Sequence, residues 1–364
     1  MQIHQIRLHN YRNYEAECVS FPASIVILYG KNGQGKTNLL EALYMASFGK
    51  SYRGLQDADL IRFQAQEASI ILSFTRSQVA QQIKIILSHT AKKELWINET
   101  KVPQRELIGT LNEVIFSPED LQLIKAGPAL RRRFLDREIS QVSSVYCRTL
   151  LRYNRAIAQR NLLLKKMKYE GPLSLEEWDR QIAGLAADIT ARRLDALHKI
   201  GFLAGVIHKR ISSGEILALA YEQPYGDGQG NVADAAWFYE KLQTHLQQDI
   251  YHMSTSVGPH RDDLVFTANG ADLKKFGSQG QQRTAVLSLE LAELEYIKSE
   301  TGEYPVLLLD DVMSELDSSR RQALLAFVRG RIQTFITTTE PDLFRSMEGC
   351  SFIRIEQGKV AAYD

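Results

Sequence analysis

The 364-residue chain has few cysteines, no long apolar run and almost no net charge, and each scarcity excludes a class of protein. Its three cysteines, Cys18, Cys147 and Cys350, are widely spaced and form no C-x-x-C pair, which excludes a disulfide framework and a structural zinc site. The longest apolar runs, such as residues 25–29, fall far short of the roughly 18 residues needed to span a bilayer. Residues 1–10 alternate apolar and polar side chains and lack the apolar centre of a secretory signal. We therefore expect a cytoplasmic protein without a membrane segment.

The composition is that of a folded protein. Apolar residues make up 44% of the chain and charged residues 24%, which excludes a mostly disordered or fibrous protein. At roughly 100 to 200 residues per domain, the length predicts two domains, and the alternative is one large α/β domain.

The near-zero charge hides a segregation of charged residues. The 44 basic and 43 acidic side chains give +1 overall, which taken alone argues against a nucleic-acid-binding protein. Residues 118–211, however, contain 18 basic and 10 acidic side chains, a net +8, and Arg148, Arg152 and Arg155 recur there at helical spacing. Such an excess favours binding to the phosphates of DNA. The alternative is a solvated helix face that binds nothing.

Apolar periodicity predicts a strand-rich part and a helix-rich part. Residues 25–29 and 306–309 are typical of buried strands, and a helix is expected over residues 36–48. Three antiparallel strands are expected at 69–75, 82–88 and 94–97. From residue 118 onward the spacing becomes helical, and Leu150, Ile157 and Leu164 lie seven apart, which predicts a helix-pairing seam. The partner helix is expected to begin at a capping box of Ser174 with Glu177.

One motif predicts a nucleotide site. Residues 30–37 fit the pattern G-x-x-x-x-G-K-[ST] between a predicted strand and a predicted helix, which is the context a P-loop requires. Its glycines allow backbone N–H groups to surround phosphate, and the helix N-terminus adds partial positive charge. Lys36 is expected to reach the β and γ phosphates and Thr37 to ligate Mg²⁺. The residues expected to hold the nucleotide are Gly30, Lys31, Asn32, Gly33, Gln34, Gly35, Lys36, Thr37 and Asn38.

A second motif supplies carboxylates. The predicted strand at 306–309 ends in Asp310 and Asp311, an arrangement that places one carboxylate on the metal ion and one beside the attacking water. Ser314, Glu315, Leu316 and Asp317 follow directly. Asp317 has an alternative role as the cap of the next helix.

A third segment resembles a phosphate-binding helix start. Ser278-Gln279-Gly280-Gln281 precedes an amphipathic helix expected over 284–298, so that a hydroxyl and free N–H groups meet at its N-terminus. Two phosphate-binding devices in one chain suggest a nucleotide held between two subunits. The alternative is that Ser278 is an ordinary N-cap residue.

In this order, the three motifs resemble the ABC-type ATPases, and three further segments narrow the resemblance. These are Asn10-Tyr11-Arg12-Asn13-Tyr14, the stretch from Pro118-Glu119 to Arg132-Arg133-Phe134-Leu135-Asp136, and Gly258-Pro259-His260-Arg261-Asp262-Asp263. Over essentially its full length the chain resembles the RecF family of bacterial DNA repair proteins, which have a head like that of the SMC proteins.

The resemblance implies a function and several residue roles. It implies a cytoplasmic ATPase that dimerises on ATP, binds DNA, and acts with RecO and RecR to load a recombinase at single-strand gaps. Lys36, Thr37, Asp310 and Asp311 would serve the nucleotide and Mg²⁺. Ser278 and Gly280, with Gln281 beside them, would contact the γ-phosphate of the opposite subunit. Arg12 would lie near the phosphates.

The chain also departs from related patterns. The second acid, Asp311, is one methylene shorter than the Glu of transport ATPases, and residues 337–339 are threonines where a His is usual. Ala126 stands where the family prefers glycine, and no Gln occurs at 116–119, where many relatives have a metal-contacting Gln. We therefore expect slow ATP hydrolysis, suited to a switch.

The predicted architecture is an α/β, ABC-type P-loop ATPase head with an inserted basic, mainly helical lobe. The head is expected at 1–117 with 285–364, and the helical lobe at 118–284. His260, Asp262 and Asp263 could suggest a metal site, but their spacing is more typical of hydrogen bonding within a loop. Two other functions share the P-loop: the nucleotide-binding subunit of a membrane transporter and a kinase of small metabolites. The basic insertion argues against the first, and the second phosphate-binding device argues against the second.

Overall fold

The computed structural model describes residues 1–212, 214–226, 232–345 and 347–363. The chain forms two compact units. We call Met1–Asp120 with Glu293–Asp364 the head unit, and Leu121–Ala292 the helical unit. The boundaries expected from the sequence were after residues 117 and 284. The second observed boundary falls inside one uninterrupted helix, α10 (Gln279–Thr301), so no local sequence signal marks it.

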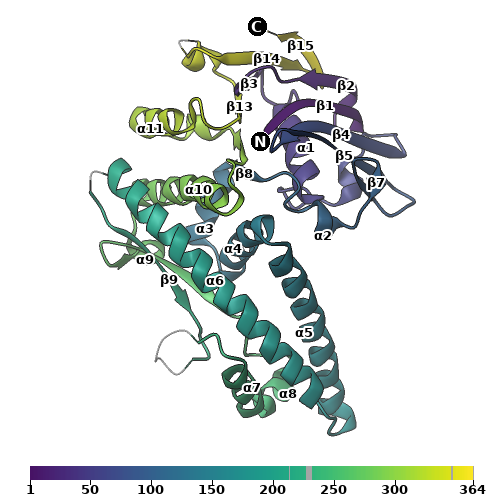
Figure 1. Ribbon diagram of the computed structural model, residues 1–364, viewed down its shortest axis with the longest axis vertical. Helices are drawn as coiled ribbons and strands as arrows, with labels where there is room; N and C mark the ends of the chain where they lie inside the picture. Colours follow the sequence, from purple (N-terminus) through teal and green to yellow (C-terminus); the bar gives the residue numbers. More distant parts are fainter. Residues whose placement is uncertain (213, 227–231, 346, 364) are drawn as a thin grey trace. The chain divides into compact units, whose positions relative to one another are not determined.

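The head unit contains two six-stranded sheets (Figure 1). The first sheet is antiparallel and has the strand order β2-β1-β4-β5-β6-β7. The predicted strands at 69–75, 82–88 and 94–97 are confirmed as neighbours in it. The bounds are β1 (Gln2–Tyr11), β2 (Tyr14–Ser20), β4 (Glu67–Arg76), β5 (Val79–Ser88), β6 (Glu94–Ile97) and β7 (Thr100–Lys101).

The second sheet carries the segments with the chemical motifs. Its order is β15-β14-β3-β13-β12-β8, and all neighbouring pairs are parallel except β14 with β15. Because β3 and β12 run parallel, their carboxyl ends lie at the same edge of the sheet. The P-loop follows β3 there, and the acidic motif lies at the end of β12. The bounds are β3 (Ile25–Tyr29), β8 (Glu113–Phe116), β12 (Val306–Asp310), β13 (Thr334–Thr338), β14 (Cys350–Glu356) and β15 (Lys359–Tyr363).

Helix α1 (Lys36–Phe48) connects the P-loop to the core of the head unit. It contacts β4 of the first sheet and β13 of the second, and it is buried on nearly all sides. A helix covered on both sides needs no polar face, which explains its almost uniformly apolar sequence from Leu39 to Phe48. The head unit also contains α2 (Gln104–Leu107) and α11 (Ser318–Val328).

The helical unit is dominated by a hairpin of two long helices, α5 (Ser144–Glu170) and α6 (Glu176–Ile211) (Figure 1). Ile157 and Leu164 are buried as the predicted seam requires, and Leu150 is half-buried. The predicted capping box is wrong: Leu175, not Ser174, is the N-cap of α6, and no side chain caps it. Acidic residues in the first turn favour this helix end through the helix dipole instead.

The other elements of the helical unit surround this hairpin. Helix α4 contacts α5 and α6, and a three-stranded antiparallel sheet β11-β10-β9 packs through β9 on α6 and through β10 on α4. The bounds are α3 (Gln122–Lys125), α4 (Pro128–Val142), β9 (Leu217–Glu222), α7 (Ala235–Thr244), α8 (Leu246–His252), β10 (Asp263–Ala268), β11 (Ala271–Asp272) and α9 (Leu273–Phe276). Within the described residues, no helix is long and apolar enough to cross a membrane.

Candidate nucleotide-binding site

The P-loop connects β3 to α1 by a turn whose backbone angles favour glycine. Gly30, Gly33 and Gly35 have φ angles of 147°, 77° and 118°, a region that other residues rarely adopt. A Cβ atom on Gly30 would also lie 2.4 Å from the backbone oxygen of Ile355. The turn is therefore fixed both by its own glycines and by the neighbouring strand β14.

The turn presents donors that the protein itself does not use. Within the described part of the chain, none of the backbone N–H groups of residues 31–37 donates a hydrogen bond. The Lys36 ammonium donates to the backbone oxygens of Gly30 (2.7 Å) and Lys31 (2.9 Å). Burial lowers the pKa of Lys36, and the nearby carboxylates of Asp311 and Asp310 oppose this effect. An anionic phosphate chain fits this cradle of unpaired donors.

Asp310, at the end of β12, accepts hydrogen bonds from three hydroxyl groups. Its Oδ1 accepts hydrogen bonds from Thr37 and from Thr337, both at 2.9 Å, and its Oδ2 accepts one from Tyr52 at 2.6 Å. The predicted pair of Thr37 and Asp310 is therefore in direct contact. A carboxylate beside a hydroxyl oxygen is the type of ligand that Mg²⁺ prefers, so these residues fit the expected ion.

Asp311 differs from its neighbour in being exposed. It has a left-handed φ of 54°, and its backbone N–H donates to Thr337 Oγ1 at 2.8 Å. This turn points the chain away from the sheet immediately after Asp310. Asp317 has the capping role that the sequence left open, because its carboxylate accepts from the backbone N–H of Arg320 at 2.9 Å at the start of α11.

The segment Asn10–Tyr14 contacts the P-loop, but through residues other than Arg12, the one singled out from the sequence. Asn13 Nδ2 donates to the Gln34 oxygen and Tyr14 OH to the Gly35 oxygen, both at 2.9 Å. Arg12 instead forms an ion pair with Glu41 on α1, with Nε 3.0 Å from Oε2. Its role toward phosphate stays a prediction.

Sequence reasoning missed several contacts of this site. Tyr52 belongs to no motif, yet it binds Asp310, and burial raises its pKa strongly, so it is a hydrogen-bond donor at any ordinary pH. The turn between β14 and β15 holds the P-loop through the backbone N–H groups of Gln357 and Gly358, which donate to the side chain and backbone of Gln34. No spacing pattern could have found either contact, because the partners are far apart in the sequence.

Ser278 lies in the helical unit, at the start of α10. Its hydroxyl accepts from the Gln281 N–H at 3.2 Å, while Gln281 Oε1 accepts from the Ser278 N–H at 3.0 Å. This reciprocal pair is a capping box, so Ser278 is the N-cap residue of α10. Ser278 is exposed. The backbone of the segment is thus fixed without a ligand, and its contact with nucleotide stays a prediction.

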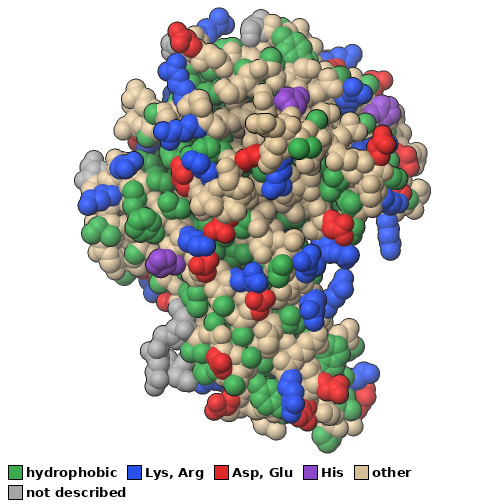
Figure 2. All heavy atoms as spheres, viewed as in Figure 1, with side chains coloured by type: hydrophobic (Ala, Val, Ile, Leu, Met, Phe, Trp, Pro, Cys, Tyr) green, Lys and Arg blue, Asp and Glu red, His purple; other side chains and the backbone are tan. Residues whose placement is uncertain are grey.

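The predicted DNA-binding arginines form an exposed stripe. Arg148, Arg152 and Arg155 on α5 are all exposed and have no ion-pair partner within the described residues. In Figure 2, Lys and Arg side chains gather over the first half of α5. Other arginines of the basic segment are internal: Arg160 is fully buried between Asp179 and Asp249. Not every arginine of the basic segment is therefore available at the surface.

The segment from His260 to Asp263 forms hydrogen bonds within the unit, as the sequence favoured. His260 contacts Tyr153, Asp262 accepts from Tyr225 at 2.6 Å, and Asp263 pairs with Arg131 at 2.7 Å. Among the described residues, no cluster of three His, Cys, Asp or Glu side chains could hold a metal ion.

Comparison with known proteins agrees with these motifs. A model described as the RecF/RecN/SMC N terminal domain matches residues 2–362. The DNA replication and repair protein RecF of Alkaliphilus oremlandii is 43% identical over 354 residues, which cover 96% of both chains. The chain belongs to the RecF family. The RecF protein of Listeria monocytogenes serovar 1/2a is 40% identical, with 93% of both chains covered.

Solved RecF structures share the architecture. One described as the recombination mediator protein RecF-ATP in the RecFOR pathway has a TM-score of 0.92 at 36% identity and covers 100% of this chain and 97% of its own. The corresponding RecF-ATPrS structure has a TM-score of 0.90 at 37% identity, covering 98% and 97%. An Smc head bound to a domain of ScpA, at 16% identity and a TM-score of 0.59, shares the fold alone. The predicted ABC-type, SMC-like ATPase fold is confirmed, and the transporter alternative is not favoured.

Proposed function

We propose that this protein is an ATP-dependent DNA-binding protein of DNA replication and recombinational repair. The observation that carries the proposal is the P-loop of unpaired backbone donors beside the contact of Thr37 with Asp310. Relatives named as DNA replication and repair proteins, and a RecF-ATP structure, support it.

The head unit supplies the nucleotide chemistry. The P-loop and Lys36 would hold the phosphates, Thr37 and Asp310 would hold Mg²⁺, and Asp311 would orient or deprotonate the attacking water. A bound Mg²⁺ neutralises phosphate charge during hydrolysis. The exposure of Asp311 and its short side chain support slow turnover, in which hydrolysis acts as a timer rather than as a source of product.

The helical unit supplies the second half of a composite site. Ser278, Gly280 and Gln281 contact the γ-phosphate held by the opposite subunit, so that ATP closes two heads into a homodimer. The capping box supports this role because it fixes the segment and leaves Ser278 exposed. Dimerisation creates or stabilises a surface for gapped DNA or single-strand/double-strand junctions. DNA stimulates the ATPase, and the protein acts with RecO and RecR in the cytoplasm.

The test is the affinity for a gapped duplex with ATP, with ADP and without nucleotide, measured by fluorescence anisotropy over a salt series. Each DNA phosphate contacted by a cationic side chain contributes about 0.9 to the slope of log affinity against log salt. The triple variant Arg148→Ala, Arg152→Ala, Arg155→Ala should flatten this slope by up to about 3 units while ATP affinity stays unchanged. Equal DNA affinity with and without ATP would refute the proposed function. An unchanged slope in the triple variant would move the DNA contact away from this stripe.

A further inference from the structure

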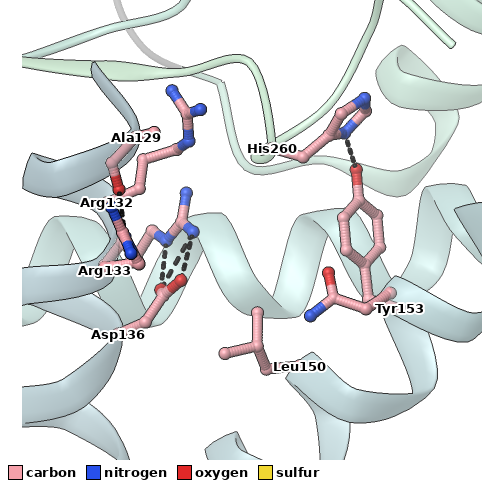
Figure 3. Close-up of a pocket in the computed structure, with 9 residues that line it drawn as sticks. Ala129, Arg132, Arg133, Asp136, Leu150, Tyr153 and His260 are labelled. Atoms are coloured by element: carbon pink, nitrogen blue, oxygen red, sulfur yellow. Dashed lines mark hydrogen bonds and ion pairs between the residues drawn. The ribbon is translucent and has the colours of Figure 1, made fainter. Parts of the chain in front are cut away.

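A small pocket in the helical unit lies on a different face of α5 from the arginine stripe. Its volume is about 230 Å³. Arg132 and Arg133 of α4 form one side, and Tyr153 of α5 with the loop residue His260 forms the other (Figure 3). Asn154 of α5 also lines the pocket. At 100° per residue, Tyr153 and Asn154 point at least about 100° away from the stripe. The pocket and the stripe are therefore separate features.

Arg132 and Arg133 of this pocket bond to backbone oxygens, although the carboxylates of Asp263, Asp262 and Asp136 act on Arg132 from farther away. Arg132 donates to the backbone oxygen of Asp262 at 2.6 Å, and Arg133 donates to the backbone oxygen of Ala129 at 3.3 Å. Within the described residues, neither guanidinium pairs with a carboxylate. The one carboxylate that lines the pocket, Asp136, accepts from Nε and from a terminal nitrogen of Arg193, at 2.9 and 3.0 Å. The net charge of the pocket is therefore positive.

The opposite wall is neutral and fixed. His260 Nε2 lies 3.0 Å from the backbone oxygen of Thr255, which can only accept, so this nitrogen carries the proton. Nδ1 then accepts from Tyr153 OH at 2.6 Å. Burial lowers the pKa of His260 to about 4, and nearby arginines add to the effect, so the ring is uncharged near neutral pH. The histidine shapes the pocket, and the arginines supply its charge.

We propose that this pocket binds a phosphate group. Two guanidinium forks and the exposed Asn154 amide offer more donors than the two oxygens of a carboxylate can accept, and they match the oxygens of a phosphate. The partial burial of Arg132 strengthens such a contact, because its charge is shielded less by water. The phosphate belongs either to the backbone of bound DNA, which rests on the proposed function, or to a free phosphate compound.

The test compares two double variants that each remove two positive charges. Arg132→Gln with Arg133→Gln changes the pocket, and Lys165→Gln with Lys166→Gln changes exposed lysines elsewhere on α5. The single variant Arg133→Gln is measured in parallel, because among the described residues this side chain bonds to its own helix alone, so its loss should not disturb folding. All proteins are first compared for secondary structure by circular dichroism.

The first arm measures affinity for a gapped duplex with ATP over a salt series. If a DNA phosphate occupies the pocket, the pocket variant should lose about 0.9 in slope and on the order of tenfold in affinity at moderate salt, with a smaller loss in the lysine variant. The second arm measures the melting temperature in sodium phosphate against sodium chloride at equal ionic strength. If free phosphate binds, the wild type and the lysine variant should gain about 2 °C or more over the pocket variant. The P-loop is intact in all of them, so its own response to phosphate cancels.

The two arms separate the sources and the possible failures. A pocket-specific loss in the first arm assigns the site to DNA, and a pocket-specific loss in the second arm alone assigns it to a free phosphate compound. If the pocket and lysine variants behave alike in both arms, the pocket does not bind phosphate. Failure of the wild type to bind DNA would refute the proposed function, whereas the second arm would still decide the pocket.

Discussion

The head unit and the helical unit differ in what supplies their positive charge. In the head unit, the P-loop offers backbone N–H groups fixed by glycine turns and by neighbouring strands, with one ammonium, Lys36, beside them. In the helical unit, side chains supply the charge, and among them two kinds of arginine stand in contrast. Arg131, Arg160 and Arg193 are buried and paired with carboxylates, whereas the stripe on α5 is exposed and has no ion-pair partner in the described part of the chain.

Because of this difference, some charged groups determine ligand binding and others determine folding stability. Backbone donors are lost only on substitution by proline, and the fold already orients them, so the charge of one side chain, Lys36, decides binding there. A buried arginine holds the unit together, because its removal leaves an uncompensated carboxylate in the interior. An exposed arginine contributes little to folding and is free to bind. Substitutions in the two units should therefore affect different properties of the protein, either ligand binding or folding stability.

The largest effect is expected at Lys36. Lys36→Met removes the only charged side chain that the P-loop directs inward, so ATP affinity should fall by more than 100-fold as measured by titration calorimetry. Lys92→Met is the matched control, because Lys92 is an exposed lysine of the head unit outside the P-loop. An affinity within threefold of wild type in Lys36→Met would contradict the assignment.

The two acids after β12 should separate binding from turnover. Asp311→Asn keeps the shape of the side chain but cannot accept a proton, so ATP should still bind while the hydrolysis rate falls by about 10² to 10⁴. Asp310→Asn removes charge from the cluster of Thr37 and Tyr52, so it should instead raise the Mg²⁺ concentration that hydrolysis requires. Identical behaviour of the two variants in a steady-state ATPase assay would show that these roles are misassigned.

In the helical unit, substitution of His260 should alter the pH dependence of folding stability and leave the binding of ATP unchanged. Because the pKa of His260 falls from 6.5 to about 4 on folding, the unfolded chain binds the proton more tightly between these values. The stabilising contribution is therefore present above pH 6.5 and is lost as the pH falls toward 4. His260→Gln removes this contribution. The difference in the free energy of unfolding between the wild type and the variant should therefore shrink by about 3 kcal/mol as the pH falls over this window.

The measurement is the free energy of unfolding in urea at pH 7 and pH 4.5 for both proteins. Burial raises the pKa of the neighbouring Asp262 to about 6, which acts in the opposite direction. Since Asp262 is present in both proteins, its contribution largely cancels in the difference. A difference between the two proteins that does not change with pH would contradict a buried neutral His260.

The sequence predicts the head site better than the helical unit, for a physical reason. A P-loop is a local backbone geometry, so its glycines and its lysine reveal it over eight residues. The partners of buried arginines come from distant segments: Arg160 is paired with Asp179 and Asp249, and no count of charges distinguishes it from the exposed Arg155. The predicted seam was correct at Ile157, because helix packing leaves a period in the sequence.

Other features had no local signal. Tyr52 reaches Asp310 across 258 positions of sequence, and a lone tyrosine carries no pattern. The capping box predicted at Ser174 failed because α6 begins at Glu176, after Leu175. The capping box that does form, at Ser278, was available from the spacing to Gln281.

In the proposed dimer, the head unit of one subunit and the helical unit of the other close around one nucleotide. The most direct test is the molar mass of the protein with and without ATP, measured by light scattering. Ser278→Arg places a bulky cation at the exposed start of α10 and leaves the P-loop intact. The wild type should be a dimer with ATP and a monomer without it, whereas Ser278→Arg should bind ATP normally, remain a monomer and fail to hydrolyse ATP. A normal ATP-dependent dimer of Ser278→Arg, or a wild type that stays monomeric with ATP, would contradict the account.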